Sequence, residues 1–165
     1  MPRNINISFS YREYEGTEEL SPEDQELILA AKEAAKLAYA PYSKFMVGAA
    51  IKLESGRIVH GSNVENAAFP SGICAERTAI AGAVSNYPDD KPVALAIAAI
   101  TDGGLPAESV SPCGNCRQVI AEEEGRTGKQ IRIILSGKNK IQVIDSVGPL
   151  LPLQFSRDSL RVNRP

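Results

Sequence analysis

The three cysteines of the chain all lie where a helix is predicted to begin. Cys74 stands in Ile-Cys-Ala-Glu-Arg, and Cys113 and Cys116 stand in Ser-Pro-Cys-Gly-Asn-Cys. The unpaired amides of a helix start stabilise a thiolate, and residues three apart lie on one face of a helix. Two such helix starts that face each other can therefore bind one zinc ion through three sulfurs. Three protein ligands leave a fourth position for water, which is typical of a catalytic zinc.

Glu76 is the only acidic residue inside the two cysteine motifs. Chemistry that uses a zinc-bound hydroxide needs one carboxylate beside the metal to take and return protons, so Glu76 is the candidate catalytic residue. Because positions two apart on a regular helix point to nearly opposite sides, Cys74 must occupy the cap if both side chains face the metal. The alternative is that Glu76 only complements the dipole of its helix.

Three thiolates exceed the charge of a zinc ion by one, so we expect a cation close to the sulfurs. Arg77 follows Cys74 by three positions, on the same side of the helix, and Arg117 follows Cys116 directly. Either arginine could donate a hydrogen bond to a sulfur, and Arg77 is favoured; the alternative for each is an exposed surface arginine. His60, the only histidine, lies outside both motifs and is expected to be structural.

The segments around these motifs predict an α/β fold in which one sheet lies between helices. A Ser-Pro-Glu-Asp sequence predicts a helix that begins at Ser21, has Ala30 and Leu37 on its apolar face and ends at Pro41. We then expect strands over 45–53 and 57–61, a helix over 74–84, a strand over 92–100, a helix over 113–123, and strands over 131–135 and 141–144. The strand over 92–100 is apolar throughout, which favours a central position covered on both faces.

Both ends of the chain carry apolar patterns of their own. Apolar and polar residues alternate from Ile5 to Tyr11, which predicts a half-buried edge strand over 4–12, followed by an acidic loop over 13–19. A group of apolar residues over 150–155 predicts an anchor near the C-terminus. We therefore divide the chain into an N-terminal extension (1–20) and one catalytic domain (21–165).

The composition narrows the classes of partner. Eighteen Lys and Arg stand against 20 Asp and Glu, so the chain lacks the basic surface that nucleic-acid binding requires. No apolar run reaches the roughly 18 residues of a membrane helix, and the N-terminus lacks the apolar core of a signal peptide. An odd number of cysteines does not suit a disulfide framework, which favours free thiols in the cytoplasm.

Five ordered blocks between Glu26 and Leu160 make the chain resemble the small homotetrameric cytidine deaminases. They are Ala-Pro-Tyr-Ser-Lys-Phe (40–45) with Val-Gly-Ala-Ala (47–50), Asn-Val-Glu-Asn-Ala-Ala-Phe (63–69), Cys-Ala-Glu-Arg-Thr-Ala (74–79), Ser-Pro-Cys-Gly-Asn-Cys-Arg-Gln-Val (111–119) and Leu-Leu-Pro (150–152). Cys-Ala-Glu followed by Pro-Cys-x-x-Cys is the cysteine version of the zinc-deaminase signature. The resemblance implies a three-layer α/β/α sandwich with a mixed five-stranded sheet, to which the strand predicted over 4–12 would add an N-terminal edge strand. It also implies one zinc per subunit, held by the three cysteines, with Glu76 as proton shuttle.

The resemblance further implies the substrate: cytidine and 2′-deoxycytidine, hydrolysed to the uridines with release of ammonia in pyrimidine salvage. Asn63 and Glu65 match the residues that hold the ribose hydroxyls, which suits an amide that donates and accepts beside a carboxylate that accepts. Phe45 matches a residue that packs against the pyrimidine, and the amide of Ala75 is placed to hydrogen-bond the base. The alternatives are a turn-forming polar loop for Asn63 and Glu65, and a core position for Phe45.

Neighbouring subunits complete the active site in this family. The resemblance implies that Ala67, Phe69 and Phe155 reach a site in another chain of the homotetramer. The sequence departs from the family pattern in three places: Met46 replaces a frequent proline, Phe69 lacks the hydroxyl of the usual tyrosine, and Pro149 interrupts an acidic helix. None of these departures touches the predicted zinc ligands or Glu76.

Three other functions stay open. A related zinc aminohydrolase could act on a modified nucleoside such as blasticidin S or on a free base, although Asn63 and Glu65 favour a ribose. A polynucleotide editor needs a basic groove, for which the charge balance gives little material. A non-enzymatic zinc scaffold normally uses four protein ligands, and only three are present.

Overall fold

The sheet extends in both directions from β4 (Pro92–Ile100), a strand whose interior residues are all apolar. The computed structural model describes residues 2–101 and 104–160, and its six strands lie in the order β1-β6-β5-β4-β2-β3. β4 pairs with β5 in parallel, and the other pairings are antiparallel. The other strands are β1 (Arg12–Tyr14), β2 (Met46–Leu53), β3 (Ile58–Ser62), β5 (Arg132–Ser136) and β6 (Ile141–Ile144). The predicted mixed sheet with an added edge strand is confirmed.

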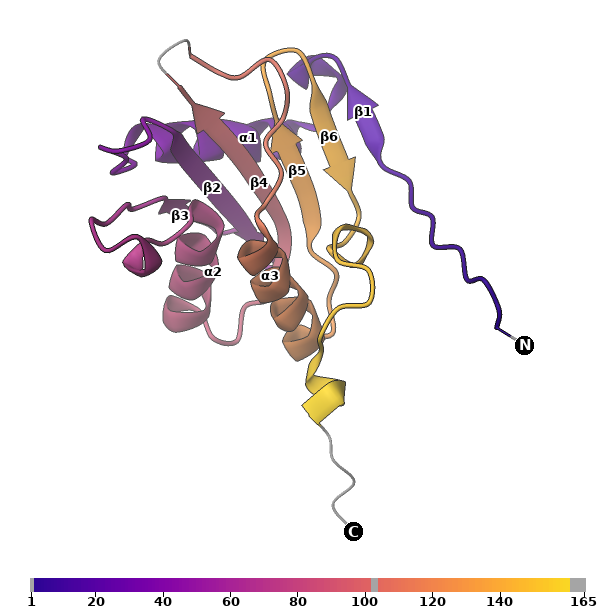
Figure 1. Ribbon diagram of the computed structural model, residues 1–165. Helices are drawn as coiled ribbons and strands as arrows, with labels where there is room; N and C mark the ends of the chain where they lie inside the picture. Colours follow the sequence, from indigo (N-terminus) through magenta and orange to yellow (C-terminus); the bar gives the residue numbers. More distant parts are fainter. Residues whose placement is uncertain (1, 102–103, 161–165) are drawn as a thin grey trace.

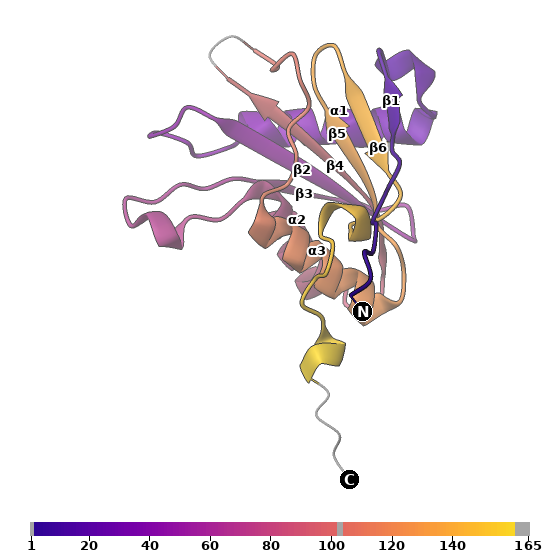
Figure 2. The same ribbon diagram turned by 45° about the vertical axis from the view of Figure 1, so that its right-hand side comes forward.

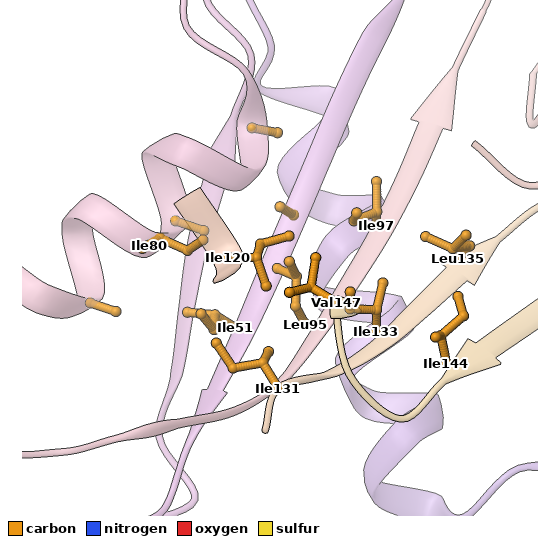
Figure 3. Close-up of a cluster of buried hydrophobic side chains, with 14 of the residues drawn as sticks. Ile51, Ile80, Leu95, Ile97, Ile120, Ile131, Ile133, Leu135, Ile144 and Val147 are labelled. Atoms are coloured by element: carbon orange, nitrogen blue, oxygen red, sulfur yellow. The ribbon is translucent and has the colours of Figure 1, made fainter. Parts of the chain in front are cut away.

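Helices cover both faces of this sheet, as Figures 1 and 2 show. α1 (Pro22–Lys36) lies on one face, while α2 (Ala75–Asn86) and α3 (Gly114–Thr127) lie side by side on the other. The period of two along β4 sends Leu95 and Ile97 into the core under α2 and α3 (Figure 3), and Ala96 toward α1. Two separate apolar layers therefore hold the three-layer α/β/α sandwich together.

Two glycines let the helices approach the sheet closely. A Cβ at Gly48 of β2 would overlap the backbone of α1 at Ala31 and Ala35, and a Cβ at Gly61 of β3 would overlap the backbone of α2 at Ala75. The first turn of α2 thus rests directly on β3. This contact fixes the start of α2, which carries four of the candidate site residues: Cys74, Ala75, Glu76 and Arg77.

The predicted helices and strands are largely confirmed, with shifted ends. The Oγ of Ser21 accepts a hydrogen bond from the backbone N–H of Asp24 at 3.3 Å, which is the expected N-cap. The helix ends at Lys36, earlier than the predicted stop at Pro41, and Leu37 after its last turn is exposed. The apolar period of the sequence continues to Leu37, but the period alone does not show where the helix stops packing on the sheet.

The predicted strand over 4–12 is wrong in its bounds. Only Arg12–Tyr14 pairs with β6, and residues 2–11 have no regular secondary structure. β6 ends at Ile144, opposite Tyr11 in this register, so the chain before Tyr11 has no neighbouring strand to pair with. The expected loop over 13–19 correspondingly begins as β1 and continues in a short 3-10 helix (Thr17–Glu19).

The predicted C-terminal anchor is half right. Leu150 and Leu151 pack against the core beneath α3, whereas Leu153 is 93% exposed and Phe155 is 59% exposed. Short 3-10 turns, Gly148–Leu150 and Arg157–Leu160, take the place of a helix here. Within the part of the chain that the structure describes, no helix has the length and apolar character needed to cross a membrane.

Candidate active site

The two cysteine-bearing helix starts face each other, as the spacing predicted. Cys74 is the N-cap of α2 and Cys113 is the N-cap of α3, while Cys116 lies in the first turn of α3. The Sγ of Cys113 lies 3.8 Å from that of Cys74 and 3.4 Å from that of Cys116, and all three sulfurs lie within 4.8 Å of one another. Among residues 2–101 and 104–160, this is the one cluster of three or more potential metal-ligating side chains.

The sulfur triad fits a zinc ion. At a Zn–S length of about 2.3 Å, tetrahedral angles place two sulfurs about 3.8 Å apart, close to the separations found here. The donors are cysteines only, which is a ligand type that zinc prefers. Cys74 is half-buried, Cys113 is exposed and Cys116 is buried, so the triad opens toward solvent on the Cys113 side.

The electrostatics of the triad also call for a cation. Burial raises the pKa of the Cys74 and Cys116 thiols, and the negative charge of Glu76 raises the pKa of Cys116 further. Burial acts on Cys113 too, but hydrogen bonds from the backbone N–H of Cys116 and from the neighbouring thiols outweigh it and lower the pKa of Cys113. Ionising all three thiols together is therefore unfavourable unless a metal ion compensates their charge.

Glu76 lies beside the sulfurs in the first turn of α2 and is only 5% exposed. Because Cys74 is the N-cap with extended backbone (φ −77°, ψ 153°), its side chain and that of Glu76 reach the same side of the helix. Cys74 thus occupies the helix cap, which is the position required if it and Glu76 are to face the same metal. Burial raises the pKa of Glu76, against the opposing effects of its own backbone N–H, the Cys116 thiol and Arg77.

The two arginines beside the cysteines have different partners. Nη2 of Arg77 lies 3.9 Å from the Sγ of Cys74 and 3.2 Å from the carbonyl oxygen of Gly72, to which it donates. Arg117 contacts no sulfur; its Nε donates to the carbonyl of Pro112 at 2.8 Å and its Nη1 to that of Leu150 at 2.7 Å. Arg77 therefore places a cation beside the sulfur of Cys74, and Arg117 fixes the backbone before Cys113.

A cavity of about 830 Å³ is lined by Glu76 and by two of the three cysteines, Cys74 and Cys113. It brings together five of the residues predicted to bind substrate, which are Phe45, Asn63, Glu65, Phe69 and Ala75. Sequence reasoning did not single out several other lining residues, including Tyr42, Val110, Ser111 and Asn115. Ser111 and Asn115 flank the cysteines and Tyr42 stands in the first sequence block, so their positions in the motifs were an available signal.

Asn63 and Glu65 are held by the loop before β2. Oδ1 of Asn63 accepts from the N–H of Val47 at 2.7 Å, and its Nδ2 donates to the carbonyl of Phe45 at 3.0 Å. Oε2 of Glu65 accepts from the N–H of Tyr42 at 2.8 Å, and its Oε1 accepts from the hydroxyl of Ser43. The Ser43 hydrogen bond lowers the pKa of Glu65, so this carboxyl is an ionised acceptor at the cavity wall. Asn63 and Glu65 thus fix the polar loop, as the alternative reading expected, and both also line the cavity.

Comparison with known proteins decides the family. Residues 21–128 match the model of the cytidine and deoxycytidylate deaminase zinc-binding region. A cytidine deaminase of Sporosarcina psychrophila is 45% identical over 136 residues, which are 82% of this chain and 93% of the relative. The chain belongs to the cytidine and deoxycytidylate deaminase family.

Solved structures of the family agree with the fold. The crystal structure of cytidine deaminase from Burkholderia pseudomallei superposes with a TM-score of 0.68 at 38% identity, covering 79% of this chain and 97% of that one. Cytidine deaminase from Mycobacterium tuberculosis superposes with a TM-score of 0.64 at 32% identity, covering 82% and 98%. The three-layer architecture predicted from the resemblance is therefore confirmed, and the deaminase zinc-binding region contains all three cysteines.

The three residues that the resemblance assigns to a site in a neighbouring chain lie at the edge of this cavity or away from it. Phe69 stands at its mouth, 76% exposed, with its ring edge-on to Tyr42 at 5.9 Å between centroids. Ala67 is exposed and does not line the cavity. Phe155 lines a different hollow beside α3, and its carbonyl accepts from Nε2 of Gln118 at 2.9 Å. Of the departures from the family, Met46 is half-buried at the start of β2 and Pro149 lies in a 3-10 turn.

Proposed function

We propose that the chain is a zinc-dependent enzyme that hydrolyses cytidine and 2′-deoxycytidine to uridine and 2′-deoxyuridine, with release of ammonia. The observation that carries this proposal is the buried carboxyl of Glu76 beside three convergent sulfurs, with Glu76, Cys74 and Cys113 lining one cavity. The names of the relatives, cytidine deaminases at up to 45% identity, support the same reaction.

Glu76 moves protons in this reaction. Cys74, Cys113 and Cys116 would hold the zinc ion, which would lower the pKa of a water molecule and so supply hydroxide near neutral pH. Glu76, whose pKa is raised by burial, takes the proton released by water and delivers it to N3 of the pyrimidine as oxygen adds to C4. Glu76 then takes the proton of the hydroxyl group now on C4 and passes it to the amino nitrogen, the C4–N bond breaks, and ammonia leaves as the uracil carbonyl forms.

The other cavity residues bind the nucleoside. The ring of Phe45 packs against the base, and the amide of Ala75 donates to it, since N–H groups of a first helical turn lack intrahelical partners. Asn63 and Glu65 hold the ribose hydroxyls from the wall where their side chains are already fixed. Arg77 offsets the excess negative charge of the three thiolates through its contact with Cys74.

We extend the proposal to a cytoplasmic homotetramer whose active sites are shared between subunits. Phe69 and Phe155 are both large and exposed in the single chain, as expected of side chains that a neighbouring subunit covers. The three cysteines are free thiols close together without a disulfide, which suits a reducing compartment.

The test is the ultraviolet change on mixing zinc-quantified protein with cytidine, with cytosine and CMP as competing substrates. We expect one zinc per chain and turnover of cytidine, and Glu76→Gln should keep zinc while losing about 100-fold to 10,000-fold in kcat. Glu122→Gln, an exposed carboxylate on α3, is the matched control and should match the parent protein. Zinc without cytidine turnover would instead favour a deaminase of modified nucleosides, and near-normal turnover of Glu76→Gln would exclude the assigned shuttle.

A further inference from the structure

The segment 2–11, which we call the arm, has no part in the proposed reaction. Its four large apolar side chains are between 48% and 75% exposed, and they are Ile5, Ile7, Phe9 and Tyr11. Figure 1 shows the arm leaving β1 and running away from the sheet. It also precedes the residues that match the deaminase family, which begin at 21.

The arm has the sequence of a strand but lacks a partner strand in its own chain. In the antiparallel register of β1 with β6, Arg12 pairs with Val143, so Tyr11 would lie opposite Ile144, the last residue of β6. Arg12 also forms an ion pair with Asp145, the residue that follows β6. Residues before Tyr11 thus continue an edge strand whose backbone groups and apolar face remain open.

The pattern of the arm favours a second copy of this chain as its partner. No charged side chain stands between Asn4 and Tyr11, so the arm offers nothing to match a charged surface. Two identical arms, in contrast, are self-complementary when they run antiparallel about a two-fold axis through Ile7. That register places Ile7 opposite Ile7, Ile5 opposite Phe9 and Arg3 opposite the ring of Tyr11.

We propose that the arm pairs with the arm of a second copy as an antiparallel two-stranded ribbon. All of its apolar pairs lie on one face, and the polar partners Asn4 with Ser10 and Asn6 with Ser8 lie on the other. An isolated ribbon of two strands is marginal in water, but each strand here continues an edge strand of a six-stranded sheet. The ribbon therefore joins the sheets of two subunits at their β1 edges.

Cysteine cross-linking tests this register. Directly opposed residues have Cβ atoms about 4.5–5.5 Å apart, near the reach of a disulfide. Ile7→Cys should therefore form a covalent dimer on mild oxidation of the zinc-loaded protein. Ile5→Cys is the matched control, because its two copies lie four residues out of register, about 13 Å apart, and should remain monomeric on a non-reducing gel. The parent protein reports any cross-linking by the native cysteines.

Equal cross-linking at both positions would show a freely moving arm, and no cross-linking at Ile7→Cys would show that the arms do not pair; either result overturns the proposal. A second variant, Ile5→Ser with Phe9→Ser, should dissociate at least tenfold more readily on dilution in sedimentation experiments. It should turn over cytidine normally at concentrations at which its subunits remain assembled. Flotation of the parent protein with phosphatidylcholine vesicles, lost in the double variant, would assign the arm to a lipid surface and also contradict the proposal.

Discussion

The starts of α2 and α3 deliver their sulfurs to the same point, but they are held in different ways. α2 rests on β3 at Gly61, backbone against backbone, and both Ala75 and Glu76 are buried. The start of α3 is open, with Cys113 exposed and free space around Gly114. α3 is instead tied by side chains to the segment from Val147 to Leu150. One half of the site thus depends on close packing and the other on a few hydrogen bonds.

The largest effect is expected where the packing of α2 is broken. Gly61→Ala places a methyl group into the backbone of Ala75 and Ala79, so α2 must move away from β3. We expect a loss of about 3 kcal/mol in the free energy of unfolding and weaker zinc binding, because the shift carries Cys74 with it. Denaturant unfolding and zinc content measure the two effects.

Gly114→Ala is the matched change at the start of α3. A Cβ there meets nothing within 4 Å, so we expect a change within about 0.5 kcal/mol and unaltered zinc content. If both alanine variants unfold alike, the proposed contrast between the two helix starts is wrong.

The two arginines should separate turnover from metal retention. Arg77→Gln removes the cation beside Cys74. The charge of the three thiolates is then less compensated, so a zinc ion that they hold would acidify water less. We expect the variant to keep its zinc but to lose about tenfold to 100-fold in kcat per zinc-loaded subunit. The measurement is turnover normalised to bound zinc. Loss of zinc with normal turnover of the loaded fraction would assign Arg77 to holding the ligand instead.

Arg117→Gln should show the opposite division. It loses the fork that joins the carbonyls of Pro112 and Leu150, so the loop before Cys113 becomes freer. We expect zinc to transfer to a chromogenic chelator about tenfold faster, with kcat per zinc-loaded subunit close to that of the parent protein. Arg117→Lys can keep one of the two hydrogen bonds, so its rate of zinc transfer should lie between those of the parent protein and Arg117→Gln. A slower kcat with normal zinc retention would contradict this role.

Sequence reasoning reached the α2 half of the site more fully than the α3 half. Cys74, Glu76 and Arg77 interact within one helical turn, so their spacing alone predicted the cap and the Arg77 contact. The partner of Arg117 at Leu150 lies 33 residues away, and no local period encodes that contact. The strand predicted over 4–12 failed for the same reason, since its length depends on where β6 ends.

The smallest effect is expected at the far end of α3, where Glu124 completes the side-chain attachment. Its Oε1 accepts from the N–H of Ile131 at 2.8 Å and from that of Val147 at 3.1 Å. Burial nevertheless raises the pKa of Glu124, against the effect of both hydrogen bonds. A carboxyl whose pKa is raised on folding contributes stability below its unfolded pKa of about 4.5, and that contribution is lost as the pH rises through the folded value.

Glu124→Gln keeps the accepting oxygen but removes the titration. We expect the free energy of unfolding of the variant, relative to the parent protein, to improve by less than about 1 kcal/mol between pH 4 and pH 7. Denaturant melts at several pH values measure this difference, with Glu122→Gln as the exposed control on the same helix. A difference that runs the other way would mean that the ionised carboxylate is the preferred acceptor. α3 would then be held by a charge-assisted hydrogen bond at Glu124 as well as by the Arg117 fork, and its attachment would weaken in acid.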